Sequence, residues 1–259
     1  MRARPSARGS LTERQARGGG APSAVRSHRW RRPGLFALLV LSLLVVASCD
    51  PNPYQGSPDG PQLTIVGDSL VCDIERQAND RFLYEGWHVS VTALGGYTVQ
   101  DHEGTIRKVA ATNPQVVVIA LGANDIREIS EGLQTYDEYR RDVRVTLDIL
   151  RNVPFLVWVG VTTTNGYWGP DGDHRVVGPW INLITVVELA ASGRVPGTTL
   201  YADWASESAG RMDYFVAPGN VHHSALGCAA YLDLIDRAAA SFPGSPIQRP
   251  LDSVSVGPG

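Results

Sequence analysis

The sequence predicts a three-layer α/β/α sandwich built on a five-stranded parallel sheet. Short runs rich in β-branched residues alternate along the chain with longer segments that are apolar on one face. The short runs are apolar on both faces, which is typical of strands that helices cover on both sides of a parallel sheet. About 180 residues lie between the two polar ends of the chain, which is enough for one hydrophobic core.

The first 48 residues predict a lipoprotein signal peptide. Residues 1–33 hold nine arginines and one acid, Glu13, and residues 34–48 carry no charge. This uncharged run of 15 residues is shorter than the ~20 residues that span a bilayer, so a secretory signal is indicated. The sequence VASC, which ends at Cys49, resembles the lipobox of bacterial lipoproteins, whose cysteine is acylated and becomes the mature N-terminus. An ordinary signal peptide with a chance cysteine is the alternative.

The net charge changes sign at this boundary. The whole chain has 23 basic and 26 acidic residues, so removal of the nine arginines and Glu13 leaves 14 basic and 25 acidic residues, a net charge of −11. A domain this acidic argues against binding to nucleic acid and against electrostatic docking on anionic lipid. We therefore expect an exported monomer that is held at the outer face of the cell membrane only by a lipid on Cys49.

The elements of the domain, residues 62–241, follow one another in a regular order. The strands are predicted at 62–67, 87–94, 115–121, 154–162 and 198–203. The helices are predicted at 69–83, 104–112, 135–152, 178–192 and 225–240. Segments rich in Pro, Gly and Ser flank the domain, and they predict a flexible tether over 49–61 and a disordered tail over 242–259.

Residues that can carry chemistry follow the first three strands. The first strand ends in GDSL (67–70), the second in ALGGYT (93–98) and the third in LGAND (121–125). Such strand ends are where ligands bind in parallel α/β sheets. Each motif alone is weak, because a serine at a helix start is usually a cap, paired glycines usually form a turn, and an asparagine often forms an Asx-turn.

A fourth motif, PGNVHHSALG (218–227), lies near the C-terminus. In this order, the four motifs resemble those of the SGNH (GDSL) hydrolase superfamily over residues 62–240. The resemblance implies a flavodoxin-like fold, and it assigns Ser69 as nucleophile, Gly96 and Asn124 to the oxyanion hole, and His222 as base. Residues 201–235 are also similar to the esterase domains that accompany envelope-polysaccharide acyltransferases.

These assignments imply a complete reaction scheme. Ser69 attacks an ester carbonyl while His222 accepts its proton. The N–H groups of Ser69 and Gly96 and the side-chain amide of Asn124 stabilise the oxyanion. Neither a metal nor a cofactor enters this scheme. The expected substrate is a short acyl ester of the acetyl type, carried on a carbohydrate.

The chain departs from the superfamily at one position. The usual last block is D-x-x-H, but Gly219 stands three residues before His222. We therefore expect a Ser–His dyad in which a main-chain carbonyl of residues 216–220 orients His222, and Asp213 is the alternative, as a displaced acid. His223 is expected to be partly exposed.

Cys72 and Cys228 remain after removal of the signal. Disulfides persist in exported proteins, and the superfamily's first and last helices lie side by side on one face of the sheet. The expectation is a Cys72–Cys228 disulfide, with two buried free thiols as the alternative.

Three alternatives concern function. Asp171, Asp173 and His174 lie in a long loop after the fourth strand, where a solvated turn is favoured over a metal site and neighbouring aromatic residues suit a wall of the substrate site. The same catalytic residues could pass the acyl group to a sugar hydroxyl, which would make the protein an O-acyltransferase. Because Gly219 replaces the usual acid, a non-catalytic carbohydrate-binding lipoprotein is the third reading.

Overall fold

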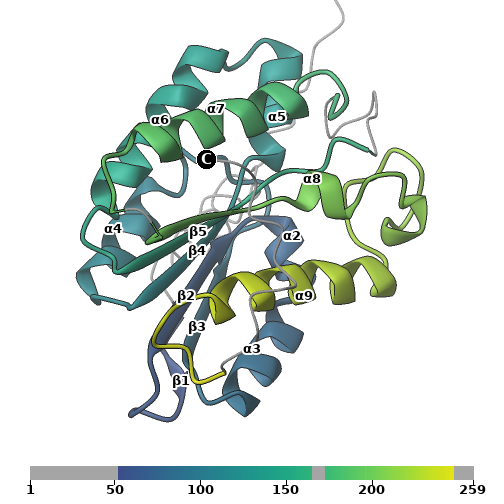
Figure 1. Ribbon diagram of the computed structural model, residues 1–259. Helices are drawn as coiled ribbons and strands as arrows, with labels where there is room; N and C mark the ends of the chain where they lie inside the picture. The colour runs from purple at the N-terminus through teal and green to yellow at the C-terminus, as the bar shows by residue number, and fades with distance from the viewer. Residues whose placement is uncertain (1–51, 165–172, 196, 248–259) are drawn as a thin grey trace, which may run out of the picture. The chain divides into compact units, whose positions relative to one another are not determined.

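The chain folds around a six-stranded sheet in which five strands are parallel (Figure 1). The structure is a computed structural model that describes residues 52–164, 173–195 and 197–247. The strand order is β1-β3-β2-β4-β5-β6. The strands are β1 (Gln55–Gly56), β2 (Gln62–Gly67), β3 (His88–Ala93), β4 (Val116–Ala120), β5 (Phe155–Val159) and β6 (Thr199–Ala202). The predicted α/β class and the five parallel strands are confirmed, and one antiparallel edge strand is added.

Helices cover both faces of this sheet, which completes the three layers (Figure 1). The helices are α2 (Ser69–Cys72), α3 (Glu75–Tyr84), α4 (Glu103–Ala111), α5 (Ala123–Glu131), α6 (Tyr136–Ile149), α7 (Gly178–Ala191), α8 (Trp204–Glu207), the 3₁₀ helix η1 (Met212–Tyr214) and α9 (Ala225–Ala240). No helix in the described part of the chain has both the length and the apolar character that a membrane crossing needs.

The alternation of side chains along each strand divides the core into two parts. Leu63 and Ile65 on β2 pack with α2, α3 and α9, while Val66 on the same strand faces α4 to α7. Both sets are fully buried. Because a strand's successive side chains point to opposite faces, continuous apolar runs such as VVVIA in β4 supply both halves of the core at once.

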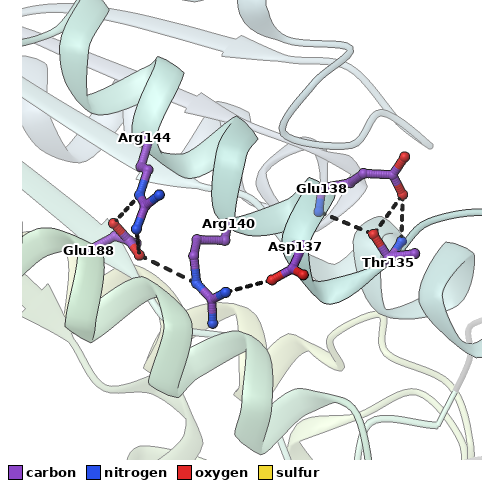
Figure 2. Close-up of polar contacts among 6 residues, drawn as sticks. All are labelled: Thr135, Asp137, Glu138, Arg140, Arg144 and Glu188. Atoms are coloured by element: carbon purple, nitrogen blue, oxygen red, sulfur yellow. Dashed lines mark hydrogen bonds and ion pairs between the residues drawn. The ribbon is translucent and has the colours of Figure 1, made fainter.

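The outer layer of α6 and α7 is joined by a buried acid. Glu188 on α7 accepts hydrogen bonds from Arg144 Nε and Nη2 on α6 at 2.6 and 2.9 Å, and Arg140 Nε lies 3.5 Å from Glu188 Oε1 (Figure 2). Thr135 and Glu138 form a capping box at the start of α6, which supplies hydrogen-bond partners for the free backbone N–H groups of this helix end. This cluster lies on the helices, not at the carboxyl ends of the strands.

The predicted flexible tether does not hold from Asn52 onwards. The backbone N–H of Asn52 donates to Thr92 Oγ1 at 3.0 Å, and its side-chain amide donates to the carbonyl of Val91 at 2.6 Å. Residues 55–56 then pair with β3 as the antiparallel strand β1. These contacts attach the segment to the edge of the sheet, because β3 would otherwise expose its backbone groups there.

The predicted disordered tail begins too early. Phe242 packs on the core, with its ring centroid 6.4 Å from that of Trp87 and 5.9 Å from that of Phe155. Residues 248–259 lie outside the described residues. Phe242 stands beside Pro, Gly and Ser residues, and the composition of this segment did not predict that its ring packs on the core.

The helix predicted at 69–83 is broken into α2 and α3. Asp73 caps the C-terminus of α2, and Ala78 N of α3 bonds to the carbonyl of Ile74. The helix α5 and the short helices α8 and η1 were not among the predicted elements. Both differences matter for the candidate site, because Asp73 lies at the break and Asn124 lies in the first turn of α5.

Candidate active site

Ser69 is the first residue of α2, and one residue, Asp68, separates it from the end of β2. A Cβ atom at Gly67 would lie 2.1 Å from Val71 Cγ2, so only glycine allows α2 to approach the strand this closely. Asp68 caps the helix by accepting a hydrogen bond from Leu70 N at 2.9 Å. The GDSL sequence thus fixes the position of Ser69 at the carboxyl edge of the sheet.

Gly96 and Asn124 reach the same edge from β3 and β4. Gly96 has φ +83°, a left-handed conformation that favours glycine. The side-chain amide of Asn124 donates to the carbonyl of Tyr97 at 3.0 Å and lies 3.5 Å from Asp68 Oδ2. The loop that follows Gly96 is therefore hydrogen-bonded to Asn124, the second residue that the resemblance assigns to the oxyanion hole.

A buried acid strengthens this connection between the two loops. Asp125 Oδ2 accepts a hydrogen bond from Val99 N at 3.1 Å, and Asp125 Oδ1 accepts one from Gln134 at 3.2 Å. Asp101 in turn accepts two hydrogen bonds from Thr98, each 2.9 Å long. These bonds hold the loop of residues 96–101 against the first turn of α5.

His222 is paired with Asp73, a residue that the sequence analysis did not select. The distance between His222 Nδ1 and Asp73 Oδ2 is 2.9 Å. Asp73 Oδ2 also lies 3.3 Å from the backbone N–H of His223, and the backbone N–H of His222 donates to Asn220 Oδ1 at 2.8 Å. Asp73 stands one helical turn after Ser69, so nucleophile and acid lie on the same side of α2.

The expectation of a dyad oriented by a main-chain carbonyl is therefore wrong, because a carboxylate occupies that position. Asp213, the alternative acid, is also wrong: its carboxylate pairs with Arg211 at 2.9 and 3.0 Å, and its side chain is 54% exposed. The hydrogen bond from Arg211 holds the pKa of Asp213 below its usual value. Gly219 has φ +79°, so the chain needs a glycine there for its conformation.

His223 is buried, contrary to the expectation of partial exposure. It is 5% exposed and lies among Trp204, Phe215 and Tyr231, with its ring centroid 4.6 Å from that of Tyr231. Burial lowers the pKa of His223 to about 4, so the ring is neutral at neutral pH. His223 is part of the core, and His222 is the histidine that faces the site.

The predicted Cys72–Cys228 disulfide is absent from the structure, in which both thiols are free. Cys72 is exposed, because α2 ends at this residue and the chain turns away at Asp73. The Sγ atom of Cys228 lies 3.8 Å from the carbonyl oxygen of Asp73. The first and last helices do pack on the same face of the sheet, but Cys72 is exposed whereas Cys228 is half-buried.

Two buried carboxyl groups of the site, those of Asp68 and Asp125, accept hydrogen bonds from uncharged donors. Burial raises the pKa of Asp68 to about 7 and that of Asp125 to about 7, against an ordinary value of 3.8. Hydrogen bonds from Leu70 N to Asp68, and from Gln134 and Val99 N to Asp125, act in the opposite direction but do not outweigh the loss of water. Both groups therefore change protonation near neutral pH.

The selected residues surround one cavity of about 210 Å³. It is lined by Ser69, Gly95, Gly96, Ala123, Asn124, Arg127, Val221 and His222. The order of the strands reverses between β2 and β4, and the cavity lies at that point, as the general rule for open α/β sheets expects. The structure therefore brings together all four residues that the resemblance assigned.

Some of the sequence-based expectations lie elsewhere. Cys49 and residues 165–172, which include Asp171, lie outside the described residues. His174 is buried, with Nδ1 3.1 Å from the carbonyl oxygen of Thr162, and Asp173 accepts a hydrogen bond from Arg175 N. Within residues 52–164, 173–195 and 197–247, no group of three or more His, Cys, Asp or Glu residues is arranged to hold a metal ion.

The comparison with known sequences decides the family. A profile of the GDSL-like lipase/acylhydrolase family matches residues 59–230, which is more than half of the chain. The chain belongs to this family. The predicted membership is confirmed, and the class of enzyme is that of the carboxylic-ester hydrolases. A search of curated proteins by sequence found no match.

Solved structures give the same fold. An acetylxylan esterase from Geobacillus stearothermophilus has a TM-score of 0.56 at 16% identity, over 75% of this chain and 99% of that chain. A GDSL-like lipase from Bacteroides thetaiotaomicron has a TM-score of 0.56 at 15% identity, over 79% and 96%. The C-terminal catalytic domain of peptidoglycan O-acetyltransferase A from Streptococcus pneumoniae has a TM-score of 0.50 at 16% identity, over 74% and 99%. At these identities the likeness concerns the fold alone.

Proposed function

We propose that this protein is an exported serine esterase that removes short acyl groups, of the acetyl type, from carbohydrate. The observation that carries the proposal is the pairing of His222 Nδ1 with Asp73 Oδ2 at 2.9 Å, beside a cavity that Ser69 also lines. With its Nδ1–H donated to Asp73, the neutral imidazole presents Nε2 as the basic nitrogen. Family membership supports the general activity, whereas the acyl group and its carrier belong to the proposal.

The reaction proceeds in two steps. His222 Nε2 accepts the proton of Ser69 Oγ as the oxygen attacks the ester carbonyl, and the tetrahedral oxyanion receives hydrogen bonds from Gly96 and Asn124. The imidazolium then gives its proton to the departing alcohol, which leaves an acyl-enzyme on Ser69. Water, deprotonated by His222, releases the acid. Asp73 keeps the required tautomer and stabilises the imidazolium in both steps.

The size of the cavity supports a short acyl group. Three of its lining residues, Gly95, Gly96 and Ala123, are small, and the total volume is about 210 Å³. A Cβ atom at Gly95 would lie 3.6 Å from Ser69 Cβ, so the backbone passes close to the nucleophile. The carbohydrate carrier rests on the likeness in fold to an acetylxylan esterase and to a peptidoglycan O-acetyltransferase.

Labelling with a fluorophosphonate probe tests the nucleophile. The wild type should be labelled, Ser69→Ala should not, and Cys72→Ala, which removes a neighbouring thiol, should be labelled like the wild type. Hydrolysis of 4-nitrophenyl acetate should exceed that of 4-nitrophenyl octanoate. Equal labelling of the wild type and Ser69→Ala would refute the proposal, and so would a preference for the long chain.

Transfer of the acyl group to a sugar hydroxyl is the second candidate, and the fold of the peptidoglycan O-acetyltransferase domain favours it. Transfer and hydrolysis share the acyl-enzyme and differ in the acceptor. Product analysis with and without a chitooligosaccharide acceptor separates them, since a transferase forms acetylated sugar at the expense of free acetate. The hypothesis of a non-catalytic carbohydrate-binding protein was based on Gly219 at the usual position of the acid. The pairing of Asp73 with His222 removes that reason.

We also propose that the mature protein begins at an acylated Cys49 and stays at the outer face of the cell membrane. Asn52 is bonded to Val91 and Thr92 near the end of β3 that leads to Gly96. Asn52 is the third residue after Cys49, so the chain can extend at most about 11 Å between them. A lipid on Cys49 would therefore keep the catalytic edge of the sheet close to the membrane surface.

Fractionation tests the anchor. The wild type should partition into detergent and carry a blocked N-terminus at Cys49, and Cys49→Ser should remain unprocessed. Release of the wild type as a water-soluble protein that Cys49→Ser does not alter would contradict the anchor and leave the esterase proposal intact.

A further inference from the structure

Arg127 lines the same cavity as Ser69 and His222. It is half-buried, and it makes no hydrogen bond or ion pair with any residue of the described part of the chain. Several other arginines of the domain have acidic partners, for example Arg144 with Glu188 and Arg211 with Asp213. The donors of the Arg127 guanidinium are therefore available to an anion that enters the cavity.

The position of Arg127 follows from that of Asn124. The two residues are three apart on α5, so their side chains leave the same face of the helix. Asn124 is expected to bind the oxyanion of the reacting ester, and Arg127 follows Asn124 by about one turn of α5. Of the eight lining residues, only Arg127 and His222 can carry a positive charge.

The negative net charge of the domain makes a positive charge at Arg127 important for binding an anion. The chain after Ser48 has a net charge of −11, so an anionic ligand is repelled by the domain as a whole. A fixed guanidinium in the cavity offsets this repulsion locally. It binds carboxylate and phosphate groups through parallel N–H donors that match their oxygen atoms.

We propose that Arg127 forms an anion subsite, and that the preferred substrates carry a carboxylate or phosphate on the alcohol side of the ester. This inference rests on the proposed function and names the substrate class more narrowly: an acylated acidic sugar. The anionic group is assigned to the alcohol side of the ester because the acyl group proposed above, of the acetyl type, carries no charge.

Three matched substrates test the subsite. They are a methyl glucoside, the corresponding glucuronoside and the glucoside 6-phosphate, each with one acetyl group at the same position. We expect the wild type to hydrolyse at least one anionic substrate about 10-fold faster than the neutral one in kcat/KM, as charge-assisted hydrogen bonds to a half-buried group allow. A preference for the glucuronoside alone identifies a uronate, and a preference for the phosphate alone identifies a phosphorylated sugar.

The variants locate the preference. Arg127→Gln should remove the ratio between anionic and neutral substrates, and Arg127→Lys should keep part of it, because lysine retains the charge but not the paired donors. The matched control is Arg151→Gln, which removes the same charge from an exposed pair with Asp148 at the opposite edge of the sheet and should leave the ratio unchanged. Added salt should lower the ratio in the wild type.

The inference is overturned if the wild type shows no anionic preference, if it hydrolyses none of the three sugars, or if Arg127→Gln keeps the preference. Failure of the proposed function has a different signature, since Ser69 would then resist the fluorophosphonate probe and 4-nitrophenyl acetate would not be hydrolysed.

Discussion

Two of the regions that bury acidic side chains in the described chain surround them with different partners. Between α6 and α7, Glu188 is enclosed by the guanidinium groups of Arg144 and Arg140 (Figure 2). At the carboxyl edge of the sheet, Asp68 and Asp125 are equally buried, but their partners are backbone N–H groups and side-chain amides. The first acid is neutralised by charge, while burial raises the pKa values of the other two to about 7.

The difference separates packing from catalysis. An acid held by arginines joins two helices and leaves its surroundings electrically neutral. Acids held by backbone donors fix the loops that carry Ser69, Gly96 and Asn124, and they leave the cationic positions of the site to His222 and Arg127. Asp73 belongs to the second region, since its partner is His222. Changes at the edge of the sheet should therefore affect turnover, and changes between the helices should affect stability.

The largest effect is expected at Asp73. Asp73→Ala removes both the acceptor for His222 Nδ1 and the charge that stabilises the imidazolium, and kcat for ester hydrolysis should fall by about 10³–10⁴. Asp213→Ala is the matched control, because Asp213 is exposed and pairs with Arg211, and it should change kcat by less than about twofold. Steady-state kinetics with 4-nitrophenyl acetate measures both. Equal losses would mean that Asp73 has no special role.

A smaller loss is expected at Asn124. Asn124→Ala removes one donor to the oxyanion, so kcat should fall by about 10²–10³ while KM changes little. The same variant loses the bond to Tyr97, so the melting temperature must be measured as well. A rise in KM with unchanged kcat would show that Asn124 binds the substrate but does not stabilise the transition state.

The buried acid Asp125 should make stability depend on pH. Its pKa of about 7 lies above the ordinary 3.8, so between these values the folded chain keeps a proton that the unfolded chain has lost. The free energy of unfolding therefore falls as pH rises through this window and levels off above it. Asp125→Asn cannot titrate, so its stability relative to the wild type should rise with pH, by at most about 1.4 kcal/mol per pH unit.

Denaturant titrations of both proteins between pH 4 and pH 8 measure this difference. Burial lowers the pKa values of His102 and His223 to about 4, which gives a slope of the opposite sign, but both histidines are present in both proteins and cancel. A difference that stays constant with pH would show that Asp125 is ionised throughout.

The smallest effect is expected between the helices. Glu188→Gln keeps the shape of the side chain but removes the charge that the two arginines share, and the melting temperature should fall by about 2–4 °C. Hydrolysis should be unchanged. Asp137→Asn, at the exposed ion pair with Arg140 on α6, should shift the melting temperature less. A loss of activity in Glu188→Gln would break the separation between the two regions.

Most of the fold could be predicted, because its signal is local. Runs of β-branched apolar residues, such as VVVIA in β4, predict strands by their composition alone. All five parallel strands lie within two or three residues of the predicted bounds. The tether was misread for the opposite reason. Asn52 and Tyr54 are held by hydrogen bonds to distant residues, and no pattern within residues 49–61 reveals those partners.

The sequence predicted the site residues that belong to a motif, but not the acid, which lies outside the position that the motif gives it. Ser69, Gly96, Asn124 and His222 were found by their order along the chain. The motif places the acid three residues before the histidine. Asp73 lies 149 residues before His222 in the sequence and approaches it only in the folded chain, so the motif could not predict it. Its signal was its spacing, since an acid four residues after a nucleophile on a helix lies on the same face.

The tautomer of His222 tests the central claim most directly. In the neutral wild type, two-dimensional ¹H–¹⁵N spectra of histidine-labelled protein should show the proton of His222 on Nδ1, because Asp73 Oδ2 accepts it. Asp73→Ala should lose this preference, and Asp213→Ala should keep it. A wild-type His222 protonated on Nε2, or a tautomer that Asp73→Ala leaves unchanged, would contradict the assignment of Asp73 as the acid that orients the catalytic base.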